Sequence, residues 1–130
     1  MGERKTAIVT GSATGVGAAS ALALARHGYD VLINYSKSER EAKDAEAACR
    51  DAGADTLCAR GDVAEDADCR AIVQAAFGRW GRLDALVNNA GITTFAGSGN
   101  WDALDAPTFQ RIFAVNLLGA FQMIRASAPH

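Results

Sequence analysis

The sequence TGSATGVG, residues 10–17, decides the fold, because it joins the apolar run TAIVT to the helix-like stretch AASALALARHG. Its glycines Gly11, Gly15 and Gly17 are spaced four and two residues apart. Glycines so placed permit a tight turn, let a pyrophosphate approach the backbone and let a helix pack closely on a sheet. Backbone N–H groups at a helix start bind phosphate, so the stretch predicts a strand, a phosphate-binding turn and a helix beginning near residue 15.

The glycine spacing also leaves an alternative open. It differs from the common dinucleotide fingerprint G-x-G-x-x-G, and it lacks the Lys-Ser/Thr ending of a P-loop. Three glycines in a turn can also serve close packing alone. The phosphate interpretation therefore depends on what the rest of the chain contains.

Four short apolar runs rich in β-branched residues alternate with four longer segments of helical spacing. This alternation is typical of an α/β fold with a doubly wound parallel sheet. We expect strands at residues 6–10, 31–35, 56–59 and 85–88. Apolar steps of three and four predict a helix that packs on the sheet through Cys69, Ile72, Val73, Ala76, Phe77 and Trp80. A helix over residues 38–52 is expected to bury Ala42, Ala45, Ala48, Cys49 and Ala52.

Length, charge and cysteine usage exclude several classes of function. The 130 residues suffice for one domain, and 13 Lys and Arg nearly balance 15 Asp and Glu, with no basic stripe. We therefore expect no nucleic-acid partner and no membrane partner. No leader or run of 18 apolar residues signals export or insertion. The three cysteines lack C-x-x-C spacing, so we expect reduced thiols, no metal site and a cytoplasmic location.

Three further motifs follow the glycine turn in order: GDV at residues 61–63, NNAG at 88–91 and VNL at 115–117. With these four motifs the chain resembles the short-chain dehydrogenase/reductase family over essentially its whole length, most closely reductases of the 3-oxoacyl-thioester type. The resemblance implies a Rossmann-type sheet, of which this chain holds the first four βα units. It also implies an oxidoreductase that transfers hydride between a nicotinamide cofactor and a small-molecule carbonyl or alcohol, and a homo-oligomer, a tetramer, when complete.

The GDV motif places Asp62 where the third strand ends, at the sheet edge where ligands of such folds collect. In the resembled family this residue bonds the amine of adenine, and the next residue, here Val63, contributes a backbone or apolar contact. The alternative is that Asp62 caps the helix segment that starts at Glu65. Both roles are compatible.

The NNAG motif follows the fourth strand, and its Ala-Gly pair leaves room where a backbone passes close to a ring or ribose. In the resembled family Asn89, Ala90 and Gly91 flank the adenosine ribose, whereas the first asparagine, Asn88, steadies the central strand. A plain turn of the Asn-Gly type is the alternative.

Cofactor choice depends on the end of the second strand, where an acid would bond the ribose 2′-hydroxyl of NAD and repel the 2′-phosphate of NADP. The sequence there is INYSKSE, with no acid at Asn34, Tyr35 or Ser36. Ser36 and Lys37 offer a hydroxyl and a cation, so NADP is expected in preference to NAD, although Lys37 can also be a solvated surface residue. Many NADP-dependent relatives carry Arg or Lys where this chain has Thr14.

Asn116 is the candidate catalytic residue. It falls on a helical apolar stripe and is therefore expected in a core position; the stripe consists of Phe109, Ile112, Phe113, Leu117, Ala120, Phe121 and Ile124. A buried amide without partners costs about 1–3 kcal/mol, so it is either satisfied by neighbours or kept for a function. In the resembled family the asparagine at this point perturbs the helix and holds a water that relays protons to a catalytic lysine.

The family's catalytic Tyr-x-x-x-Lys pair and serine are not found, since neither Tyr29 nor Tyr35 has a lysine four residues later. We therefore expect residues 1–130 to be a truncated dinucleotide-binding domain that is inactive alone. A non-catalytic nucleotide-binding module and an assembly scaffold that uses the phenylalanine face are the alternatives. The segment 92–101, with Thr94, Phe95 and Trp101, is the only candidate wall for a substrate, and the alternative is that these are exposed loop residues. The candidate cofactor-binding residues are Gly11, Ser12, Thr14, Gly15, Val16, Gly17, Tyr35, Ser36, Lys37, Asp62, Val63, Asn89, Ala90 and Gly91.

Overall fold

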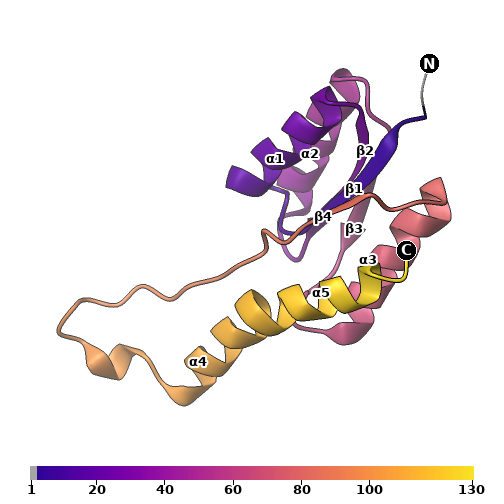
Figure 1. The fold of residues 1–130 in the computed structure, drawn as a ribbon. Coiled ribbons are helices and arrows are strands. Elements are labelled where there is room, and N and C mark those ends of the chain that lie inside the picture. The colour runs from indigo at the N-terminus through magenta and orange to yellow at the C-terminus, as the bar shows by residue number, and fades with distance from the viewer. Residues whose placement is uncertain (1–2) are drawn as a thin grey trace.

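Four parallel strands in the order β3-β2-β1-β4 form the centre of the computed structural model, which describes residues 3–130 (Figure 1). The strands are β1 (Lys5–Val9), β2 (Tyr29–Tyr35), β3 (Thr56–Arg60) and β4 (Ala85–Val87). The helices are α1 (Gly15–Arg26), α2 (Glu39–Asp51), α3 (Asp66–Trp80), α4 (Ala106–Phe113) and α5 (Gly119–Ser127), with a short 3₁₀ turn at Trp101–Ala103 and a π-helical turn at Ala114–Leu118. The predicted α/β class and the four predicted strands are confirmed, with boundaries displaced by one or two residues.

Helices cover both faces of the sheet. Figure 1 shows α1 and α2 on one face and α3 and α5 on the other. Neighbouring side chains of β1 point to opposite faces of the sheet. Ile8 packs in the apolar core between the sheet and helices α3 and α5, and Val9 packs in the apolar core between the sheet and helices α1 and α2. Strands that are buried on both faces are continuously apolar rather than alternating, which explains the runs seen in the sequence.

The predicted packing of α3 is confirmed except at Phe77, which is half-buried and lies outside the core, with its ring centroid 4.3 Å from that of His130. Cys69, Ile72, Val73 and Ala76 are buried against the sheet, and Trp80 packs beside them. The helix ends at Gly81, whose φ of 70° lies in the left-handed region that favours glycine.

The expectation for α2 is wrong in one respect. Ala42 and Cys49 are buried as predicted, but Ala48 is exposed and Glu46 is buried in its place, at 4% exposure. The Glu46 carboxylate is stabilised there by Lys43, 3.7 Å away, and by Arg50, 3.3 Å away. These two cations on neighbouring turns reduce the cost of burying the charge at this position.

The expected core position of Asn116 is also wrong. The stripe it shares faces solvent, and the exposed side chains include Phe109, Phe113, Leu117, Phe121 and Ile124. The face that packs inward carries Val115, Gly119, Gln122 and Met123 instead. Gln122 is the buried amide of this helix, and its Nε2 donates to the Val63 carbonyl at 2.8 Å. Helical spacing identifies an apolar face without saying which partner covers it, which is why the sequence misassigned the core.

All three cysteines within the described residues are free thiols, and Cys49 and Cys69 are buried. Burial raises the pKa of the Cys69 thiol to about 11. None of the helices in residues 3–130 is long and apolar enough to span a membrane.

Two helix glycines provide a test of the packing. A Cβ on Gly17 would overlap the Gly11 carbonyl oxygen and come within 2.9 Å of Ser12 Cα, whereas a Cβ on Gly78 would meet no atom within 4 Å. In the intact protein we expect Gly17→Ala to lower the free energy of unfolding by about 1–3 kcal/mol through overpacking. Gly78→Ala is expected to raise it by about 0.5–1 kcal/mol through helix propensity. Urea unfolding measures both, and equal effects of the two substitutions would contradict the packing of α1 described here.

Candidate functional site

A groove of about 340 Å³ lies where the strands end at the carboxyl edge of the sheet. The predicted cofactor-binding residues that line it are Gly11, Thr14, Tyr35, Ser36, Asp62, Val63, Asn89, Ala90 and Gly91. It is also lined by residues that were not among the predicted cofactor-binding residues, which are Ala13, Asn34, Ser38, Gly61, Ile92, Arg111 and Val115. Segments that are far apart in the sequence therefore meet at one edge.

The turn after β1 is joined to the segment after β4. Thr10 Oγ1 accepts hydrogen bonds from the N–H groups of Asn89 and Ala90, both at 3.1 Å. Asn89 Nδ2 donates to the Gly11 carbonyl at 3.0 Å. Gly11 has φ of 60°, and a Cβ there would lie 2.9 Å from Ala90 Cα. Only glycine fits this close approach, so Gly11 shapes the groove floor.

The side chain of Asn34 joins the ends of three strands. It is 2% exposed at the end of β2, and its Oδ1 accepts from the Gly11 N–H at 3.0 Å. Its Nδ2 donates to the carbonyls of Ala59 at 3.1 Å and Gly61 at 3.3 Å. The sequence analysis treated this residue only as a non-acidic position, because partners more than 20 residues away leave no local pattern.

Ser12 lies beneath the turn rather than in the groove. Its side chain is fully buried, and its Oγ donates to the Val9 carbonyl at 2.7 Å and accepts from the Asn34 N–H at 2.9 Å. The structure therefore places the hydroxyl in support of the turn, where it does not line the groove.

The start of α1 has the chemistry of an anion site. The N-cap residue Thr14 makes no side-chain hydrogen bond to the helix, and the first turn holds no acidic residue. Gly15 has φ of 57°, and a Cβ there would meet no atom within 4 Å, so the space beside it is open. Val16 is 75% exposed, and Gly17 is buried under the turn. Backbone N–H groups without side-chain caps fit the diphosphate of a dinucleotide.

Asp62 is paired with a residue that the sequence analysis did not identify. Its Oδ2 accepts from Arg111 Nη2 at 2.8 Å, and its Oδ1 accepts from the Ala64 N–H at 2.9 Å. Partial burial raises the pKa of Asp62, but the Ala64 N–H, the Arg111 guanidinium and the charge of Lys37 outweigh it and hold the pKa below its ordinary value. The bond to Ala64 lies ahead of α3, whose N-cap is Glu65, so Asp62 closes a turn rather than capping the helix.

The end of β2 carries the residues expected to distinguish NADP from NAD. Tyr35 and Ser36 line the groove, whereas Lys37 lines an adjoining hollow of about 430 Å³ together with Ser36, Asp62 and Arg111. No cluster of three or more His, Cys, Asp or Glu side chains within residues 3–130 could hold a metal ion.

Asn116 is exposed within the π-helical turn, and both ends of its amide bond the backbone of Ile92. Its Oδ1 accepts from the Ile92 N–H at 2.8 Å, and its Nδ2 donates to the Ile92 carbonyl at 2.9 Å. The amide is therefore satisfied, and it ties the helix to the segment that leaves β4.

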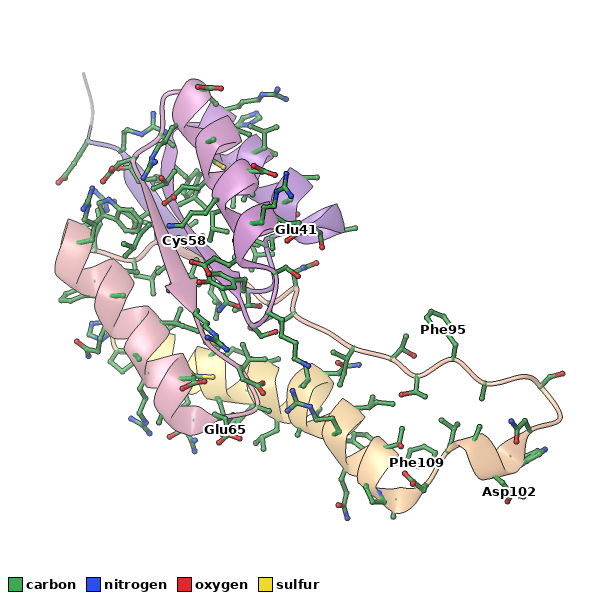
Figure 2. All side chains as sticks on the ribbon, turned by 180° about the vertical axis from the view of Figure 1, so that it is seen from behind. Glu41, Cys58, Glu65, Phe95, Asp102 and Phe109 are labelled. Atoms are coloured by element: carbon green, nitrogen blue, oxygen red, sulfur yellow. The ribbon has the colours of Figure 1, made fainter. Side chains whose placement is uncertain are left out.

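The candidate substrate wall lies away from the groove. Figure 2 shows the segment beyond β4 extending from the body of the molecule, with Phe95 pointing outward. Phe95 is 93% exposed and Trp101 is 85% exposed, and Thr94 is exposed as well. Of the segment 92–101, only Ile92 lines the groove.

Comparison with known proteins gives a consistent result. The model of the short chain dehydrogenase family matches residues 5–130. An oxidoreductase of Methylorubrum extorquens is 38% identical over 98% of this chain and 50% of its own length, and an L-rhamnose 1-dehydrogenase (NAD(P)(+)) of a Sphingomonas species is 39% identical over 97% and 48%. A solved structure from Burkholderia xenovorans, assigned to the short-chain dehydrogenases/reductases, matches with a TM-score of 0.94 and 43% identity over 99% of this chain and 53% of that one. The chain spans about half the length of these relatives.

The pair of Asp62 and Arg111 is testable by a double-mutant cycle in the intact protein. We expect Asp62→Asn and Arg111→Met to show a coupling free energy of about 0.5–1 kcal/mol, because the pair is partly exposed. Since the folded pKa of Asp62 is lowered, this coupling is fully present above the ordinary carboxyl pKa of about 3.9 and is lost as the pH falls through the lowered folded value. Urea unfolding at neutral and acidic pH measures it; a coupling of zero at neutral pH would show that the pair does not form.

Proposed function

The chain belongs to the short-chain dehydrogenase family, and on that premise we propose that it is the NADP(H)-binding part of an oxidoreductase acting on a small-molecule carbonyl or alcohol. The observation that carries the proposal is the groove at the carboxyl edge of the sheet, which begins at the uncapped start of α1. Ligands of open α/β sheets bind at this edge. When bound, the nicotinamide supplies or receives the hydride.

Different residues around the groove would bind different parts of the nucleotide. The N–H groups at the start of α1, from Gly15 onward, would hold the diphosphate. The Asp62 carboxylate keeps lone pairs beside its two hydrogen bonds and would accept from the adenine amine. Ala90 and Gly91 leave space for the adenosine ribose.

A preference for NADP over NAD is supported by the end of β2. Asn34 is buried and fully engaged, and neither Tyr35 nor Ser36 carries a negative charge. No carboxylate at these three positions would repel a 2′-phosphate, and Ser36 and Lys37 are available to bind it.

Asn116 is proposed to hold a water that takes part in proton transfer, because its two bonds to Ile92 use one of the two acceptor sites of Oδ1 and one of the two N–H groups of Nδ2. The π-helical turn Ala114–Leu118 widens the helix at this residue, and such turns occur frequently at functional sites. Because residues 1–130 contain no Tyr-x-x-x-Lys pair, we propose that the proton-exchanging residues come from chain outside this range, and that residues 1–130 alone bind nucleotide without turnover.

The apolar face of the last helices supports an assembly. Phe113, Leu117, Leu118 and Phe121 surround an apolar hollow of about 630 Å³. Exposed apolar patches mark interaction sites, and we propose that this face is covered in a homotetramer.

We further propose that the substrates are carbonyl compounds of the 3-oxoacyl type. Because the cysteines are free, we also propose a cytoplasmic location.

Two glycines at opposite ends of α1 test the phosphate site. Gly15 and Gly28 have φ of 57° and 92°, and a Cβ on either would meet no atom within 4 Å. In the intact protein we expect Gly15→Ala and Gly28→Ala each to cost roughly 1–2 kcal/mol of stability, because both force a left-handed residue. Only Gly15→Ala is expected to weaken NADPH binding, by about tenfold, since its methyl group occupies space at the diphosphate. Calorimetric titration measures this; equal affinities of the two variants would contradict the proposed site.

A further inference from the structure

The hollow that adjoins the groove gathers cations from three elements. Lys37 follows β2, Arg60 is the last residue of β3, and Arg111 comes from α4. The hollow and the groove share Ser36, Gly61, Asp62 and Arg111, so the two are continuous.

The charges in this hollow do not balance. Its carboxylates are Asp62, which pairs with Arg111, and Asp68, which accepts from the Asp62 N–H at 2.9 Å. Within residues 3–130, no ion pair involves Lys37 or Arg60. Three cationic and two anionic side chains leave the hollow with a net positive charge, which favours an anionic ligand.

Arg60 is held in place at the end of β2. It is paired in register with Tyr35, and its Nε donates to the Ser36 carbonyl at 3.2 Å. An arginine has five N–H donors in a rigid fork, and this hydrogen bond uses one of them. The side chain is thus held beside Ser36, the residue proposed to bind the 2′-phosphate, while retaining donors that match a phosphate.

Lys37, which follows β2, lines the same hollow as Arg60. Its ammonium charge contributes to lowering the pKa of Asp62, the residue proposed to bind adenine. Ser36, Lys37, Arg60 and Asp62 line this one hollow, so a ligand with its adenine at Asp62 and its ribose 2′ substituent at Ser36 would present that substituent to the cations of the hollow.

We propose that Arg60, together with Lys37, binds the 2′-phosphate of NADP(H) and is a determinant of cofactor specificity. This inference rests on the proposed function, since it assumes that a dinucleotide occupies the groove. The ligand class is a nucleotide with a phosphate monoester on its adenosine ribose, which carries close to two negative charges at neutral pH.

The test compares NADPH and NADH binding to the intact protein and to two variants, by calorimetric titration. Arg60→Gln removes one of the three positive charges in the hollow, and Arg26→Gln makes the same change on an exposed residue in the last turn of α1. We expect Arg60→Gln to weaken NADPH binding by about tenfold and to leave NADH binding within about twofold, because only NADPH has the charge-assisted hydrogen bonds to lose. Arg60→Lys should restore part of the NADPH affinity, and Arg26→Gln should change neither.

The outcomes separate this inference from the proposed function. If the wild-type protein binds NADPH and NADH equally well, or if Arg60→Gln weakens both nucleotides alike, the specificity role is wrong while the nucleotide site stands. If the wild-type protein binds neither nucleotide, the proposed function itself fails.

Discussion

One buried amide, the side chain of Asn34, determines how the carboxyl edge of this sheet is arranged. It bonds the backbone after β1 at Gly11 and the end of β3 at Ala59 and Gly61, and so fixes the relative positions of three strand ends. Leaving such a group unsatisfied costs about 1–3 kcal/mol, a sizeable share of the roughly 5–15 kcal/mol by which a typical domain is stable, so the native fold favours this arrangement. The turn that this amide holds then closes on Ala90, and the groove forms between them.

The charged groups at the amino edge of the sheet are paired with one another, whereas those at the carboxyl edge leave an excess of positive charge. At the amino edge, Asp55 accepts from Arg79 at 3.0 Å, and Asp84 accepts from Arg82 at 2.7 Å, so acids just ahead of β3 and β4 are paired within the chain. At the carboxyl edge, the helix start is uncapped and the hollow beside β2 carries excess positive charge. The acids at the amino edge are thus neutralised by arginines of the same chain, whereas the carboxyl edge keeps N–H groups and cations that can bind an anion.

The fold was predictable from the sequence where the signal is local. The strands and α3 follow from apolar runs and helical spacing, and the glycine turn follows from Gly11, Gly15 and Gly17. The pair of Asp62 and Arg111 was not predictable, because 49 residues separate the two and neither has a distinctive neighbourhood. The position of Asn116 was mispredicted because periodicity shows that a helix has an apolar face but not whether that face is covered within the same chain.

Hydrogen–deuterium exchange of the intact protein with and without NADPH tests the central claim most directly, because it locates the nucleotide on the backbone. The account predicts added protection at residues 11–17, 61–64 and 88–92, and unchanged exchange at the amino edge around residues 28–30, 53–55 and 82–84. Protection confined to α4 and α5 or to the amino edge, with none in the turn after β1, would contradict it.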